Sequence, residues 1–251
     1  MLLFKILLAP VLIALVSLAG RKWGPGVSGW LLGIPFNSGP ILFFLVLEQG
    51  PQFASRTALG SLLGILAWAA FTLTYAYSCL KLPWWYSTII GWIAYFAVAA
   101  LILPMTLSIL PAFTVVSIVL AVILWAFPKV APPRAQTVHG QYDLWLRMGT
   151  ASFMVVTLTG FAKLLGPIAS GILSAFPAYT TILAVFNHRH EAAAAVYVLR
   201  GVSVGLYTAA TFFLILSPAL LRLPATAAFG LALTGGLVVH GLSLIYVRRN
   251  A

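Results

Sequence analysis

Four charged side chains lie within or beside apolar segments that are long enough to cross a membrane. Arg56 and Arg200 lie early in two such segments, Glu48 lies at the end of one, and Glu191 lies at the start of another. A charge inside a membrane is costly and usually marks the route of a solute or a proton. We therefore expect the two arginines to attract an anion and either glutamate to carry a coupling proton. In the alternative interpretation, the arginines reach the membrane surface, and the glutamates are interfacial carboxylates or form an ion pair with Arg56 or Arg189.

A second group of candidate residues surrounds two proline-containing interruptions of the apolar segments. The first reads Gly33-Ile34-Pro35-Phe36-Asn37-Ser38-Gly39-Pro40, and the second reads Phe176-Pro177-Ala178-Tyr179-Thr180-Thr181. Proline lacks a backbone donor and clashes with the preceding turn, so a helix should break at each. The helix that restarts after a break presents free N–H groups and a partial positive charge. The predicted solute-binding residues are Pro35, Asn37, Ser38, Gly39, Pro177, Tyr179, Thr180 and Thr181, with Arg56 and Arg200.

Both interruptions belong to a pattern that occurs twice in the chain. The pattern is Gly-Pro-x-x-Ser-Gly-x-Leu-x-x-x-Pro, at residues 24–35 and again at residues 166–177. Downstream, Gly60, Gly64 and Phe71 correspond to Gly201, Gly205 and Phe212. Membrane repeats that are broken at matching positions are the sequence signature of a transporter binding site. The alternative is that the small residues only allow helices to pack closely.

The composition predicts an all-α integral membrane protein. Of 251 residues, 62% are hydrophobic and 7% are charged, and the mean hydropathy is +1.07. The apolar segments are about 20 residues long, as a membrane-spanning helix requires, and the short alternating segments of a β-barrel are not seen. A net charge of +11 could suggest nucleic acid, but the basic residues are scattered singly at segment ends. That distribution is typical of charges that orient a membrane protein, so we expect no nucleic-acid partner.

The apolar segments predict about nine transmembrane helices. Their expected ranges are 2–20, 28–48, 57–78, 84–102, 106–127, 144–163, 167–186, 192–216 and 224–246. The first is expected to be a retained span, because no cleavage site of small residues follows it. The excess of Lys and Arg in alternate loops places the N-terminus outside and the C-terminus in the cytoplasm. We expect a multi-pass protein of the bacterial inner membrane.

The one long hydrophilic stretch divides the chain into two homologous repeats. Residues 1–127 form the first repeat, 128–143 a cytoplasmic linker, and 144–251 the second repeat. Five spans before the linker would make the second repeat enter the membrane in the opposite direction, so the repeats are expected to be inverted. If the region near Pro104 and Pro111 holds one span fewer, the repeats would be parallel instead.

Enzymatic activity is not expected. Ser28 and Ser170 each precede a glycine, but no Asp or His recurs with them and the pattern is not a nucleophile elbow. Cys79 is the only cysteine, which excludes a disulfide or a cysteine-pair redox site within one chain.

The histidines do not predict a metal site either. His188 and His190 flank an arginine in a loop and lack a third ligand nearby. His240 stands alone in an apolar segment, and we expect it to be packed and hydrogen-bonded, not part of a proton relay. No cofactor is expected.

Each half resembles the small four-span bacterial inner-membrane proteins of the GlpM type. The resemblance covers about 55 residues per copy and rests on Ser-Gly-x-Leu, the following proline, Leu199-Arg200-Gly201 and Tyr207. The first copy departs from the pattern, because Leu59 precedes its glycine in place of arginine. The resemblance implies a fused duplicate of a unit able to pair with itself, and a loose link to envelope polysaccharide. Pairing of whole chains into a homo-oligomer stays open.

Together these features favour a small secondary transporter that works by alternating access around the two broken helices. Its expected substrate is an anionic or anion-bearing small solute, and membrane lipids are its other partners. One alternative is a non-transporting scaffold or assembly factor for envelope polysaccharide, in which the breaks are dry and packed. A second is a lipid flippase, in which Arg56 and Arg200 meet phosphate head groups.

Overall fold

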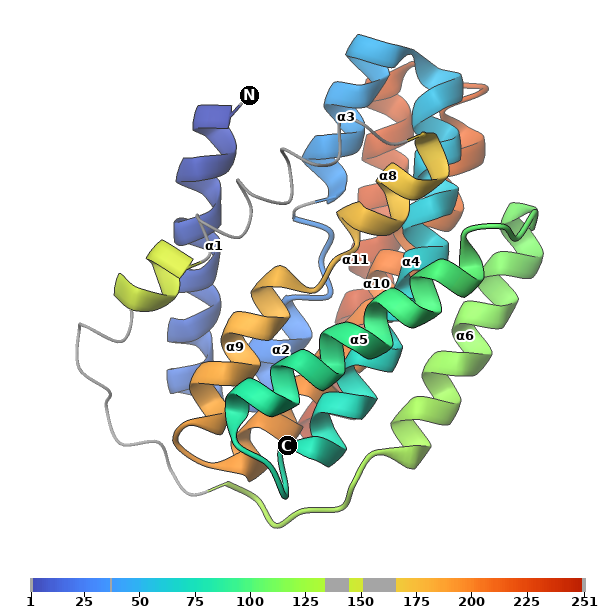
Figure 1. Cartoon of the computed structure of the whole chain (residues 1–251). Coiled ribbons are helices and arrows are strands. Elements are labelled where there is room, and N and C mark those ends of the chain that lie inside the picture. The colour runs from blue at the N-terminus through green and yellow to red at the C-terminus, as the bar shows by residue number, and fades with distance from the viewer. Residues whose placement is uncertain (1, 37, 134–144, 151–165, 250–251) are drawn as a thin grey trace.

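The computed structural model describes residues 2–36, 38–133, 145–150 and 166–249 (Figure 1). The described residues form helices and connecting turns, and none is in a strand. The helices of the first half are α1 (Leu2–Trp23), α2 (Pro25–Leu31), α3 (Ser38–Gln49), α4 (Pro51–Ser78), α5 (Trp84–Ile102) and α6 (Ile109–Ala126). Those of the second half are α8 (Pro167–Ser174), α9 (Ala178–His188), α10 (Ala192–Ala219) and α11 (Ala225–Arg249).

Six helical segments among the described residues are long and apolar enough to cross a membrane. They are α4, α5, α6, the pair α8 and α9 taken together, α10 and α11. This number of apolar segments makes the chain a multi-pass membrane protein, as its composition predicts.

The remaining three of the nine predicted spans have different outcomes. The range 2–20 lies within α1. The range 28–48 covers parts of α2 and α3 and the non-helical residues between them. The range 144–163 falls mainly outside the described residues, as does most of the linker 128–143. A total of nine spans therefore stays a prediction, and so does the division into repeats.

Two long helices, α4 and α10, form the centre of the protein. Within an apolar stretch of 18 residues in each helix, 67% of the stretch is buried in α4 and 72% in α10. The corresponding shares in α5, α6 and α11 are 28%, 22% and 28%. The outer helices expose large apolar side chains such as Ile93, Trp125 and Leu242. Since lipid tails are as apolar as leucine, these exposed surfaces suit contact with hydrocarbon.

The central helices α4 and α10 pack antiparallel to each other. At one end, the Ser55 hydroxyl donates to the Ser217 carbonyl at 2.7 Å, and the Ser217 hydroxyl donates to the Ser55 carbonyl at 3.1 Å. Toward the other end, the hydroxyls of Thr72 and Ser203 are 3.1 Å apart. Ser55 lies near the start of α4 and Ser217 near the end of α10, so the two helices run in opposite directions.

Glycines on α10 bring its backbone against the short helix α2. A Cβ added to Gly201 would collide with the Gly26 carbonyl, and one added to Gly205 would lie 2.9 Å from the Gly33 Cα. Contact this close requires glycine, because any side chain would push the two backbones apart.

Glycines on α4 make the corresponding contacts with the short helix α8. An added Cβ on Gly60 would lie 2.9 Å from the Ile168 Cα, and one on Gly64 would lie 3.1 Å from the Ile172 Cα. Gly60 and Gly64 are the residues that match Gly201 and Gly205 in the repeated pattern. Each short helix thus packs on the long helix of the opposite half.

The glycine contacts predict a specific loss of stability. Gly205→Ala would force α2 and α10 apart, and we expect it to lower the free energy of unfolding by about 1–3 kcal/mol. Gly241→Ala on α11 is the matched control, since nothing lies within 4 Å of a Cβ added there. Unfolding of both purified variants in detergent checks the prediction, and equal stability of the two would contradict it.

Candidate functional site

The first interruption is a tight turn between α2 and α3. Helical hydrogen bonding ends when the Ile34 N–H bonds the Leu31 carbonyl at 3.2 Å. The Phe36 N–H then bonds the Ile34 carbonyl at 2.7 Å, across Pro35, which has no N–H to offer. Helix α3 restarts when the Gly39 N–H bonds the Pro35 carbonyl at 2.9 Å.

The second interruption, between α8 and α9, repeats this turn. The Phe176 N–H bonds the Leu173 carbonyl at 3.0 Å, and the Ala178 N–H bonds the Phe176 carbonyl at 2.8 Å. The Thr181 N–H then bonds the Pro177 carbonyl at 2.8 Å. The last two bonds join residues that correspond to those of the first turn at one constant offset in the sequence. The same proline position therefore produces the same local structure twice.

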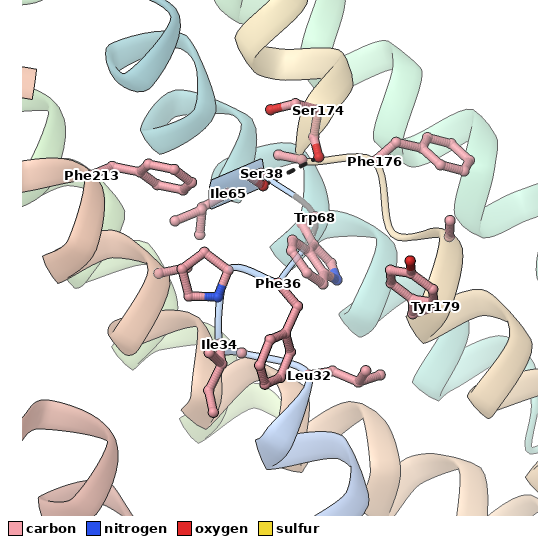
Figure 2. Close-up of a pocket in the computed structure, with 15 residues that line it drawn as sticks. Leu32, Ile34, Phe36, Ser38, Ile65, Trp68, Ser174, Phe176, Tyr179 and Phe213 are labelled. Carbon is pink, nitrogen blue, oxygen red and sulfur yellow. Dashed lines mark hydrogen bonds between the residues drawn. The ribbon is translucent and has the colours of Figure 1, made fainter. Parts of the chain in front are cut away.

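The two turns meet at one cavity in the centre of the protein (Figure 2). The space open to the centres of water-sized molecules is about 30 Å³, enough for about two water molecules. Fifteen of the described residues line it, and these come from the two turns and their helix ends or from α4 and α10. They are Leu32, Gly33, Ile34, Pro35, Phe36, Ser38, Ile65, Trp68, Ser174, Ala175, Phe176, Ala178, Tyr179, Ala209 and Phe213.

One hydrogen bond joins the two turns directly beside the cavity. The Ser38 hydroxyl donates to the Ser174 carbonyl at 3.4 Å, as the dashed line in Figure 2 marks. The Ser174 hydroxyl donates to the Gly171 carbonyl at 2.8 Å and lies 3.0 Å from the Ser61 hydroxyl of α4. The Ser38 bond is long, and the Ser174 hydroxyl lies between two partners. A small movement of either turn would therefore break the contact between them.

Aromatic side chains form much of the remaining wall. Phe36, Trp68, Phe176, Tyr179 and Phe213 all line the cavity (Figure 2). Outside the cavity, the Phe176 ring packs against rings on α5 at centroid distances of 5.1–5.9 Å. The second turn is therefore held in place by α5 as well as by α4.

The described residues that line the cavity include no charged side chain. The N-terminal ends of α3 and α9 border the cavity at Ser38 and Ala178, and a helix N-terminus carries a partial positive charge. A helix N-terminus stabilises a nearby negative charge by about 0.3–1 kcal/mol at an exposed site and by up to about 2 kcal/mol when partly buried. Placing a whole ion in an apolar site costs several kcal/mol. The cavity is suited to dipoles more than to full charges.

The charged residues predicted to bind solute lie away from the cavity. Nine residues, or about two and a half helical turns, separate Arg200 from Ala209 on α10, and the same number separates Arg56 from Ile65 on α4. Each arginine therefore projects from the opposite face of its helix, about 13 Å along the axis. Arg56 is exposed, and Arg200 is half-buried with a buried Nε that has no hydrogen-bond partner among the described residues.

The predicted coupling residues also lie at a distance. Glu48 is exposed near the end of α3, about 15 Å along the helix from Ser38. Glu191 is half-buried and immediately precedes α10. Solute binding by the arginines and proton coupling by the glutamates stay predictions.

The predicted residues of the two turns divide into lining and supporting positions. Pro35, Ser38 and Tyr179 line the cavity, and Asn37 lies outside the described residues. The supporting positions, which are buried but do not line the cavity, are Gly39, Pro177, Thr180 and Thr181.

Two of these supporting threonines differ in their hydrogen bonds. The Thr181 hydroxyl donates to the Pro177 carbonyl at 2.8 Å and accepts from the Trp92 indole at 3.2 Å. The Thr180 hydroxyl is fully buried and has no partner among the described residues. Thr181 thus fixes the second turn to α5, whereas Thr180 retains a free donor and acceptor.

Two polar residues of the site were missed by the sequence reasoning, Trp68 and Ser174. A signal for each was present. Ser174 lies within the repeated pattern, three residues before Pro177, and Trp68 follows Gly64 by one helical turn and so shares its inward face. The Trp68 indole nitrogen is buried and has no hydrogen-bond partner among the described residues.

His240 is packed and hydrogen-bonded, as predicted. Its ring stacks on Trp30 at a centroid distance of 3.7 Å, and its Nδ1 lies 2.8 Å from the Thr208 hydroxyl. The Trp30 indole in turn donates to the Ser243 hydroxyl at 2.8 Å. This cluster fixes α11 to α2 just before the first turn.

The chain shows no significant match to any protein-family model, curated protein or solved structure. The resemblance to GlpM-type proteins therefore stays a prediction.

The unpartnered indole of Trp68 predicts an unusual response to mutation. A buried donor without a partner costs about 1–3 kcal/mol, so Trp68→Phe should leave the free energy of unfolding unchanged or raise it. Trp92→Phe is the matched control, because it removes an indole that is bonded to Thr181 and should lower stability by about 1 kcal/mol. Denaturant unfolding in detergent compares the two, and a larger loss for Trp68→Phe would contradict the assignment.

Proposed function

We propose that this protein is a small membrane transporter that moves a solute by alternating access through the cavity between the two turns. One observation carries the proposal: residues 32–36 and 38 of the first turn and residues 174–176, 178 and 179 of the second, which are far apart in sequence, line the same central cavity. Midplane sites between paired interrupted helices are the usual arrangement in secondary transporters.

In this proposal, α2 with α3 and α8 with α9 are two broken membrane-spanning elements. Each pair comprises two short helices separated by a proline-containing turn, and non-helical backbone in a membrane is tolerated where it borders protein or a cavity. The pairs run in opposite directions through the bundle (Figure 1). That arrangement supports the interpretation that the two halves are inverted repeats.

The exchanged glycine contacts provide further support for inverted repeats. Gly60 and Gly64 face α8 as Gly201 and Gly205 face α2, and the two long helices that carry them are antiparallel. A twofold axis in the membrane plane relates two such halves. Alternating access then follows naturally, since exchanging the conformations of the halves turns an inward-facing cavity into an outward-facing one.

The movement that we propose is small. The turns are joined across the cavity by the 3.4 Å contact of Ser38 with the Ser174 carbonyl. If the two turns moved apart at this contact, a path would open from the cavity to one face of the membrane. The packing of α2 on α10 and of α8 on α4 would be kept. The bacterial inner membrane, with the N-terminus outside and the C-terminus cytoplasmic, is the proposed setting.

The main alternative is a scaffold or assembly factor for envelope polysaccharide. The small volume and the largely apolar lining of the cavity favour it, because a scaffold requires only packed turns. A flippase would require a groove open to lipid beside the arginines. The transporter and scaffold proposals differ in whether water reaches the turns: a transporter requires it, and a scaffold does not.

Cysteine accessibility tests the transport proposal. Single cysteines at Ser38 and Tyr179, in a Cys79→Ser background, should react with a membrane-impermeant maleimide added from one side of sealed vesicles. Both positions line the shared cavity, so a transporter in one resting state should expose them to the same side. If neither cysteine reacts while an exposed Ala131→Cys does, the turns are dry and the scaffold proposal is favoured.

Two further positions control this experiment. Ala67→Cys on α4 is fully buried away from the cavity lining and should remain unlabelled. The unaltered protein, which retains Cys79, provides a second reference and should also remain unlabelled, because burial raises the pKa of the Cys79 thiol to about 12 and only the thiolate reacts. Labelling of Ala67→Cys would mean that the protein had opened or unfolded.

A further inference from the structure

Resting on the transport proposal, we infer that the cavity takes an uncharged solute whose hydrogen-bond acceptor is bound by the indole N–H of Trp68. The inference concerns the substrate class and departs from the anionic solute that the positive net charge suggests. Its basis is the chemistry of the fifteen lining residues, which differs from the chemistry of the chain as a whole.

The first argument is the lack of a counter-charge. Among the described residues no lining side chain is charged, and Arg56 and Arg200 project from the opposite faces of α4 and α10. An anion in the cavity would lose its water without gaining an ion pair, which disfavours it strongly. An uncharged solute loses much less on leaving water and can pack against the aromatic wall.

The second argument is an available donor. The Trp68 indole nitrogen is buried without a hydrogen-bond partner among the described residues, although a buried indole usually has one. In Figure 2 this nitrogen lies on the side of the ring that faces Tyr179. Because an indole can donate but not accept, the group that completes the site must be an acceptor.

The third argument concerns the other polar groups of the lining. Ser174 already donates its hydroxyl hydrogen to a backbone carbonyl, and Ser38 donates toward Ser174. The N-terminal ends of α3 and α9 add partial positive charge from two directions. A carbonyl, ether or hydroxyl oxygen between these groups matches their polarity without requiring a full charge.

The size of the cavity restricts the solute in this conformation. The volume that the centres of water-sized molecules can occupy is about 30 Å³, so a group of only a few heavy atoms fits between the turns. A small amide or alcohol, or the end of a larger solute, is of that size.

Charge preference can be measured with a cysteine in the wall. Ala209→Cys, in the Cys79→Ser background, replaces a small lining residue that makes no side-chain hydrogen bond. Purified protein in detergent is reacted with the uncharged 2-hydroxyethyl methanethiosulfonate and with the anionic 2-carboxyethyl methanethiosulfonate. Each rate is divided by the rate at the exposed Ala131→Cys, which removes the intrinsic reactivity of the reagent.

We expect the normalised rate of the uncharged reagent to exceed that of the anionic reagent by about tenfold or more. Equal rates, or a faster anionic reagent, would overturn the inference while leaving a wet transport cavity in place. Failure of both reagents would remove the cavity as a solute site, and with it the transport proposal.

A second measurement tests the role of Trp68. Acetamide and acetate have the same number of heavy atoms but differ in charge, and acetamide alone should slow the uncharged reagent at Ala209→Cys. Trp68→Phe should raise the acetamide concentration for half-protection by about 2- to 10-fold, the effect of losing one hydrogen bond. Trp92→Phe should not change it. Protection by acetate, or equal acetamide protection in Trp68→Phe, would show that the donor is assigned wrongly.

Discussion

A polypeptide in hydrocarbon cannot leave its backbone N–H and C=O groups without partners, because no water is present to bind them. This constraint decides where α2, α3, α8 and α9 can end. Both turns lie against the long, largely buried helices α4 and α10 and close with short-range hydrogen bonds. From outside, Tyr95 of α5 donates to the Ile172 carbonyl at 2.6 Å, and His240 of α11 stacks on Trp30. The centre of the protein is built around two interruptions.

Much of the helical frame could be predicted from the sequence, because apolar length and glycine spacing are local signals. The predicted range 84–102 agrees with α5 at both ends. Helix α4, by contrast, begins at Pro51, several residues before the predicted start at 57. Gly50 adopts a φ of 84°, which ends α3, and Pro51 occupies the first helical turn. The polar residues after Pro51 look like a loop, so this start was missed.

The candidate site could be predicted only in part. The two prolines were sufficient to locate the turns, since their effect on a helix is local. The residues of α4 and α10 that complete the cavity could not be predicted in the same way. They depend on how each helix is rotated about its own axis, and packing against neighbouring helices determines that rotation. For Trp68 the glycines carried that information, because Gly64 faces α8 and Trp68 lies one turn later. Arg56 lies nine residues before Ile65 and therefore on the opposite side of α4 from that lining residue. The arginines were predicted to bind solute because they are charged, but the helical period places them on the side of α4 and α10 that faces away from the cavity.

The packing of each short helix on the opposite half has a consequence for synthesis. Helix α2 is complete at Leu31, but its partner α10 begins only at Ala192, after residues 32–191 have been made. At about 5–20 residues per second the ribosome needs roughly 8–30 s for that stretch. During this interval the glycine-rich face of α2 and the open turn at Pro35 must wait in the membrane without their final contacts. The first half therefore cannot mature independently, and its packing is completed only late in translation.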